Sequence, residues 1–184
     1  IDNRAQYSHL GSINEFAKSR RHKTRPLFAR QLALDVKSLS TAPYSEERLD
    51  LLRQMVDDCH NRHIELVVVI PPFHALYLEA MRAAGRWGTF ESWKRDVVSL
   101  LAENSHEAVS LWDFSGYNRF TTEAVPRNDT RNAMQWYWES SHFKRSLGEK
   151  VIGRVLGGEG DTTFGVRLGP GNIEHHLARI RAER

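Results

Sequence analysis

Glu139 and His142 are the two residues whose types and spacing best suit catalysis. They lie three residues apart in the aromatic segment 136–143, so the carboxylate and the imidazole can meet across one turn. A carboxylate that accepts the Nδ1 proton fixes the tautomer of the ring and leaves Nε2 to act as a general base. The alternative is a surface glutamate beside a histidine that caps the next helix. The residue types alone leave both interpretations open.

Two further polar residues follow predicted strands. His74 comes shortly after the aliphatic run 64–70, and Asp113 lies at the end of a second apolar run. Because ligands of α/β sheets gather beyond the carboxyl ends of the strands, we expect both residues at the rim that carries Glu139 and His142. His74 would bind substrate or an oxyanion, or simply start a helix. Asp113 would orient His142, bind a substrate hydroxyl or cap the following turn, and the cap is the preferred interpretation.

Apolar spacing along the chain predicts the elements that must position these residues. The continuous aliphatic run 64–70 is typical of a strand covered on both faces, so it predicts a central parallel strand. The order of helices and strands is typical of an α/β fold with a mainly parallel sheet. The predicted helices are residues 45–62, 75–84, 90–103, 143–156 and 173–184, and the predicted extended segments are residues 64–70, 109–114 and 164–168.

The length of 184 residues fits a single domain. We expect an irregular N-terminal segment over residues 1–44, a core over residues 45–156 and a C-terminal extension over residues 157–184. The net charge of +3 is mild and both signs are interspersed, so no nucleic-acid partner is predicted. The basic run 18–25 is interpreted as a solvated segment, with nucleic-acid binding as the least favoured of the functions considered.

Metal and cofactor chemistry find little support in the sequence. His74, Asp113, Glu139 and His142 have ligand types that suit a metal, but no histidine pair has the spacing of a metalloprotease helix. His175 and His176 are adjacent and are expected in a polar terminal helix. The glycines of residues 153–160 follow a helix rather than open one, which argues against a phosphate loop. The sequence therefore predicts no metal and no cofactor.

Trp136 and Trp138 stand beside the candidate catalytic pair. Aromatic faces stack on sugar rings, so the two residues indicate a carbohydrate substrate. Core packing is the alternative interpretation for most aromatic residues of this region. Since the two tryptophans have the same parity, an extended segment would place both on one face.

Residues 139–143 with residues 147–152 resemble the last conserved block of the SGNH (GDSL-like) hydrolases: an acid, two residues, a histidine, then a helix with an early glycine. The similarity covers roughly residues 45–156. It implies a flavodoxin-like, SGNH-like three-layer sandwich and serine-type acyl transfer, with His142 as base and Glu139 as the residue that orients it. Members are esterases, lipases and carbohydrate O-acyltransferases. The implied partner is a small-molecule or polysaccharide ester, in the periplasm or cell envelope, with a membrane anchor possible outside this chain.

The sequence departs from this family at two positions. The family usually carries Asp where this chain has Glu139, and its nucleophilic serine follows the first strand in a Gly-Asp-Ser turn. Ser12, after Gly11, is the only early candidate, and no apolar strand precedes it. We expect the serine upstream of Ile1, so whether this chain is an enzyme depends on that serine. The alternative is a non-catalytic carbohydrate-binding or interaction module with a degenerate or truncated SGNH fold.

Overall fold

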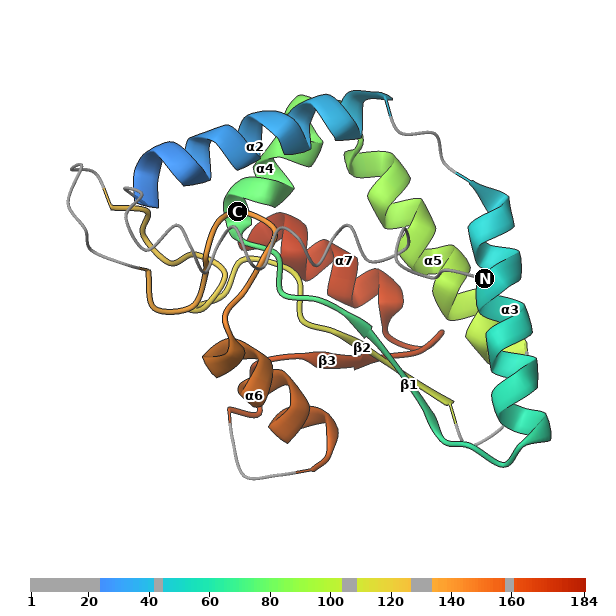
Figure 1. Ribbon diagram of the computed structural model, residues 1–184. Helices are drawn as coiled ribbons and strands as arrows, with labels where there is room; N and C mark the ends of the chain where they lie inside the picture. Colours follow the sequence, from blue (N-terminus) through green and yellow to red (C-terminus); the bar gives the residue numbers. More distant parts are fainter. Residues whose placement is uncertain (1–23, 42–44, 104–108, 127–133, 158–160) are drawn as a thin grey trace, which may run out of the picture.

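The computed structural model describes residues 24–41, 45–103, 109–126, 134–157 and 161–184. The helices and strands predicted from residue 45 onward all occur close to their predicted ends. Residues 24–41, expected to be irregular, instead form one helix that packs against α4 (Figure 1). The elements are α2 (Thr24–Thr41), α3 (Glu46–Asn61), β1 (Leu66–Ile70), α4 (Ala75–Ala83), α5 (Trp87–Glu103), β2 (Val109–Asp113), α6 (Arg145–Val155), β3 (Val166–Leu168) and α7 (Ile173–Ala182).

The described strands form one mixed sheet in the order β1-β2-β3. β1 and β2 are parallel, with Leu66 opposite Val109 and Ile70 opposite Asp113, whereas β3 runs antiparallel to β2. The α/β class is therefore confirmed, and the expected parallel pairing holds for β1 with β2. The prediction that β1 is the central strand is wrong for the described sheet, because β2 occupies that position.

Helices cover both faces of this sheet (Figure 1). Ile70 and Leu111 face the cluster that α3, α5 and α7 build, while Val69 and Trp112 face α6 on the other side. Because both faces of β1 are covered, its sequence is a continuous aliphatic run even though β1 lies at an edge of the described sheet. Such a run indicates covered faces and does not show how many neighbouring strands pair with the edges.

Two chain features place the start of α4 at the end of β1. Pro71 and Pro72 follow Ile70 directly and cannot donate backbone hydrogen bonds to a continuing strand. His74 then takes the N-cap position, with an extended backbone and a side chain that accepts a hydrogen bond from the N–H of Leu76. None of the described helices combines the length and the apolar composition that crossing a membrane requires.

Candidate functional site

Glu139 and His142 meet in the loop that precedes α6. The loop is closed by an antiparallel bridge between Tyr137 and Phe143, and the N–H of Trp138 donates to the carbonyl of His142 at 3.0 Å. This closure turns the loop back on itself, so that Oε1 of Glu139 contacts Nδ1 of His142. The Glu139 side chain is fully buried, whereas 58% of the His142 side chain is exposed. The pair therefore combines an enclosed carboxylate with an accessible imidazole.

The carboxylate of Glu139 has a fixed orientation. Its Oε2 accepts hydrogen bonds from the backbone N–H of Ser141 at 2.9 Å and from the Ser141 hydroxyl at 3.1 Å. The hydrogen bond that His142 donates to Glu139 raises the pKa of His142 above its ordinary value, although partial burial of the ring acts in the opposite direction. Because the carboxylate occupies Nδ1, the Nε2 edge of the ring is the one directed away from Glu139.

Helix α2 reaches the same loop through Asp35. The hydroxyl of Ser140 donates to Oδ2 of Asp35 at 2.5 Å, and Nε2 of Gln31 donates to Oδ1 at 2.9 Å. Both Asp35 and Ser140 are buried. Sequence reasoning missed both residues. Asp35 lies seven residues after Phe28, so both are on the same face of α2, and both are buried. A charged group on a buried face needs a hydrogen-bonding partner, and this spacing is the signal that could have identified Asp35.

His74 lies under this loop and is buried. Its Nδ1 accepts from the N–H of Leu76 at 3.1 Å, so Nε2 carries the proton and donates to the carbonyl of Glu123 at 2.8 Å. Burial lowers the pKa of His74, which keeps the ring neutral. Its backbone N–H also donates to the carbonyl of Ser140 at 3.1 Å. Both ring nitrogens of His74 are thus engaged inside the protein, and its backbone supports the loop.

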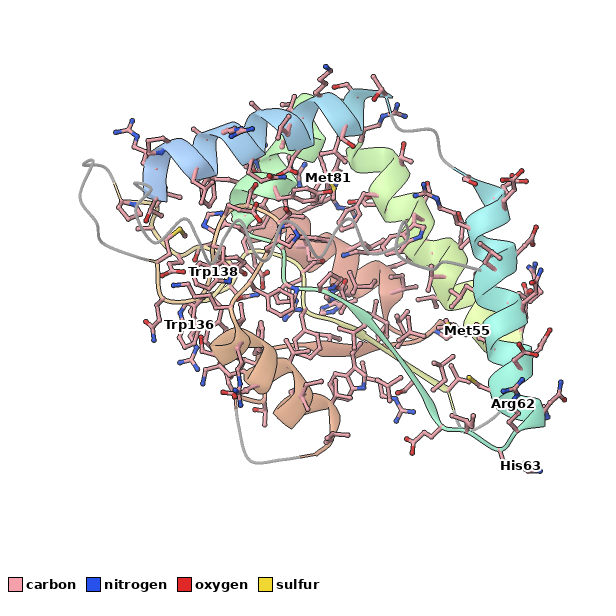
Figure 2. The ribbon with its side chains drawn as sticks, viewed as in Figure 1. Met55, Arg62, His63, Met81, Trp136 and Trp138 are labelled. Carbon is pink, nitrogen blue, oxygen red and sulfur yellow. The ribbon has the colours of Figure 1, made fainter. Side chains whose placement is uncertain are left out.

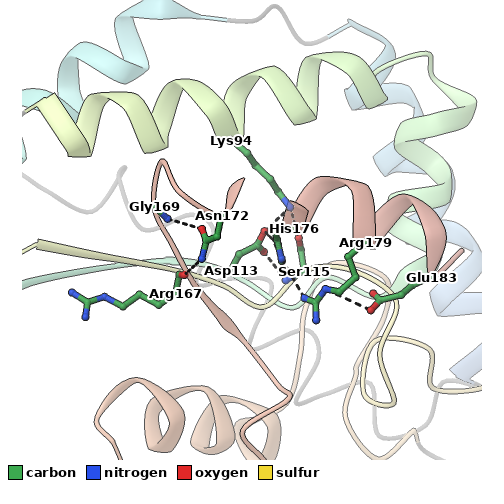
Figure 3. Close-up of polar contacts among 9 residues, drawn as sticks. All are labelled: Lys94, Asp113, Ser115, Arg167, Gly169, Asn172, His176, Arg179 and Glu183. Carbon is green, nitrogen blue, oxygen red and sulfur yellow. Dashed lines mark hydrogen bonds and ion pairs between the residues drawn. The ribbon is translucent and has the colours of Figure 1, made fainter. Parts of the chain in front are cut away.

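Asp113 takes part in a separate buried cluster (Figure 3). Its Oδ2 accepts from Nζ of Lys94 at 2.6 Å and from Nε2 of His176 at 2.8 Å, and its Oδ1 accepts from the N–H of Ser115 at 2.8 Å. Burial alone would raise the pKa of Asp113, but Lys94 and His176 reverse the effect and hold it well below its usual range. The contact with Ser115 is a turn cap, which is one of the roles expected from the sequence.

The expectation that His176 belongs to a polar tail is wrong. His176 is buried, and it lies on the face of α7 that also buries Leu177 and Ile180. The guanidinium of Arg179 donates to its Nδ1 at 3.2 Å, so Nε2 carries the proton that is donated to Asp113. The exposed arginines of α7 obscured this apolar face in the sequence.

Lys94 is the other residue of this cluster that the sequence analysis missed. It is fully buried, and its Nζ also donates to the hydroxyl of Ser115 at 2.7 Å. Lys94 lies four residues after Phe90 and three before Val97, both of which are buried on the same helix. A lysine inside such a stripe needs a buried anionic partner, which is the signal that predicts the cluster.

The two tryptophans lie beside the start of α6 (Figure 2) and differ in exposure. Trp138 is 47% exposed, and Nζ of Lys144 lies 4.7 Å from its ring centroid. Trp136 is partly buried and packs edge-to-face against Phe120 at 5.2 Å. Of the two, Trp138 therefore offers the larger aromatic surface next to His142.

A cavity of about 600 Å³ lies elsewhere, between α3, α5 and β1. Apolar residues such as Leu52, Val68 and Trp93 dominate its lining, which includes neither Glu139 nor His142. Over the ranges that the structure describes, no three His, Cys, Asp or Glu side chains come together as a metal ion would require. The candidate nucleophile Ser12 and most of the basic run 18–25 lie outside the described residues.

The fold and the site define an α/β protein in which a buried carboxylate is paired with an exposed histidine. Comparison with known protein families, with curated proteins and with solved structures finds no match for this chain.

Proposed function

We propose that the chain belongs to an SGNH-like esterase or O-acyltransferase of the three-layer sandwich type, in which Glu139 and His142 form the general-base unit. The observation that carries this proposal is the contact of the buried Glu139 carboxylate with Nδ1 of an accessible imidazole. Glutamate is one methylene longer than the aspartate of the resembling family. The two hydrogen bonds from Ser141 offset this added freedom by holding the carboxylate in place.

The reaction would be acyl transfer through a serine ester. Nε2 of His142 removes the proton of a serine hydroxyl as its oxygen attacks the ester carbonyl, and it returns that proton to the departing alcohol. Water or an acceptor hydroxyl then cleaves the acyl-serine by the reverse proton route. Glu139 keeps the tautomer and stabilises the imidazolium between the two transfers. The proposal gives the role of nucleophile to none of the described serines.

An acylated carbohydrate, such as a polysaccharide of the cell envelope, is the substrate class we favour. The exposed indole of Trp138 supports it, because a sugar ring can stack on an aromatic face and Trp138 is joined to His142 by a backbone hydrogen bond. Its neighbour Lys144 supplies a cationic group beside the ring.

The test is hydrolysis of a model acetyl ester by the full-length protein. We expect His142→Ala to abolish turnover while the circular dichroism spectrum is retained, and His175→Ala, which changes an exposed histidine of α7, to leave turnover intact. Since Glu139 raises the pKa of His142, the acid limb of kcat/KM should lie above pH 6.5 and move down in Glu139→Gln. Unchanged turnover in His142→Ala would refute the mechanism.

The half-exposed Trp138 also favours a second candidate, a carbohydrate-binding module without catalysis. This function predicts no ester turnover but measurable glycan binding by calorimetry. The binding should be lost in Trp138→Ala and retained in His142→Ala, which separates it from the catalytic proposal.

A further inference from the structure

Asp35 is a buried carboxylate whose hydrogen-bond donors are both neutral. The hydroxyl of Ser140 and the side-chain amide of Gln31 each donate to one of its oxygens, at 2.5 and 2.9 Å. A buried carboxylate that is held by neutral donors retains a substantial desolvation cost. Its charge therefore acts on the groups around it at a low effective dielectric constant.

Ser140 stands between two carboxylates. Its Oγ lies 2.5 Å from Oδ2 of Asp35 and 3.4 Å from Oε2 of Glu139. A hydroxyl has one proton to donate, and the shorter distance assigns that proton to Asp35. Glu139 then accepts its hydrogen bonds from Ser141 and His142. The carbonyl of Ser140 accepts from the N–H of His74, so the loop is held by α2 through a side chain and by the start of α4 through the backbone.

The charged and titratable groups around Asp35 come from two parts of the fold. The loop contributes Glu139 and His142, and α4 contributes Tyr77, whose pKa is raised by burial and by the charge of Asp35. Among these groups the imidazolium of His142 is the one that a second carboxylate stabilises, and Asp35 acts on it in the same direction as Glu139. Asp35 thus acts on the Glu139–His142 pair in two ways, through its negative charge and through the hydrogen bond from Ser140 that tethers the loop to α2.

We propose that Asp35 is a positioning residue for the Glu139–His142 pair and acts through the hydroxyl of Ser140. The catalytic meaning of this role rests on the proposed function, but the positioning itself is a property of the His142 ring that needs no substrate. A merely structural role, in which Asp35 only fastens α2 to the loop, would change the stability of the protein and leave the titration of His142 as it is.

The experiment is an NMR titration of the His142 ring in the whole 184-residue chain. We expect the pKa of His142 to lie above 6.5 in the wild type, to fall in Asp35→Asn and to fall further in Glu139→Gln. Asp50→Asn is the matched control, because it removes the same charge from an exposed site on α3 where Asp50 contacts Arg53. The pKa of His142 should not move in this control.

Two further variants separate the charge from the tether. Asp35→Glu keeps the charge and the acceptor oxygens, so it should restore most of the wild-type pKa. Ser140→Ala keeps both carboxylates but removes the hydroxyl between them, so the Nδ1 proton of His142 should exchange with water several-fold faster. If Asp35→Asn does not fold, these two variants decide the question.

A folded Asp35→Asn protein with an unchanged His142 titration would overturn the proposal, as would Ser140→Ala with unchanged exchange of the Nδ1 proton. A failure of the proposed function is a different result. In that case His142→Ala would keep its ester turnover, while the titrations of the Asp35 variants would still show the expected shifts.

Discussion

Lys94→Met tests the buried cluster at the carboxyl end of β2. The variant keeps the length and the apolar stem of the side chain but removes a fully buried ammonium that donates to Asp113 and Ser115. Asp113 then keeps only His176 and the N–H of Ser115 as donors. Breaking a buried pair by removing one partner costs about 3–5 kcal/mol, because the remaining charge is left without compensation. Since two donors remain, we expect about 3 kcal/mol, at the lower end of that range.

Urea unfolding followed by tryptophan fluorescence measures this loss. With a slope of about 2–3 kcal/mol/M, a loss of about 3 kcal/mol lowers the midpoint by about 1–1.5 M at pH 7. The matched control is Arg95→Met on the same helix, which removes an exposed pair with Glu174. An exposed pair contributes about 0–1 kcal/mol, so the control should shift the midpoint far less.

The pH dependence of this loss has a defined sign. Lys94 and His176 hold the pKa of Asp113 down in the folded protein, whereas the unfolded chain protonates Asp113 near pH 4. The stability that the pair contributes is therefore present above about pH 4 and is lost as the pH falls further. The difference between Lys94→Met and the wild type should shrink in acid. A loss below about 1 kcal/mol at pH 7, or one that grows in acid, would refute the reasoning.

Two substitutions test other close contacts. Gly165→Ala should destabilise the protein by several degrees in thermal unfolding, because Gly165 has a φ of +84° and a Cβ would lie 2.7 Å from Cδ1 of Phe114. Gly153→Ala, at an open helical position in α6, should instead stabilise it, and equal effects of the two would contradict the steric argument. Tyr137→Phe should cost about 1–2 kcal/mol in urea unfolding, because the buried hydroxyl donates to the carbonyl of Pro72 at 2.8 Å. A neutral result would show that this carbonyl needs no donor.

The sequence predicted the local features of this protein well. Apolar spacing located the helices from residue 45 onward, and the short separation of Glu139 and His142 allowed the contact that the structure shows, one of the two interpretations left open. Both depend on residues that are close in the chain, where helix and turn geometry limit the possible arrangements. The roles of His74 and Asp113 depend instead on partners in other elements, such as Glu123 and Lys94.

Apart from helix α2, the features that sequence reasoning missed depend on contacts between residues that are distant in the chain. Asp35 and Ser140 are 105 residues apart, and no pattern within either segment identifies the other. Lys94 and Asp35 were each passed over because apolar periodicity counts hydrophobic residues and ignores a charge placed among them. The pairing at the edges of β1 was missed for a related reason, since side-chain composition describes the faces of a strand and says nothing of its neighbours.

The bond between Asp113 and His176 also constrains the order of assembly during synthesis. The two residues are 63 positions apart, whereas Lys94 and Asp113 are both made before the ribosome reaches α6. Until α7 has emerged, Asp113 lacks its histidine donor and the apolar cluster that β2 shares with α3, α5 and α7 is incomplete. Because translation takes several seconds for this distance, the nascent chain must keep its central strand in solution with an incomplete core.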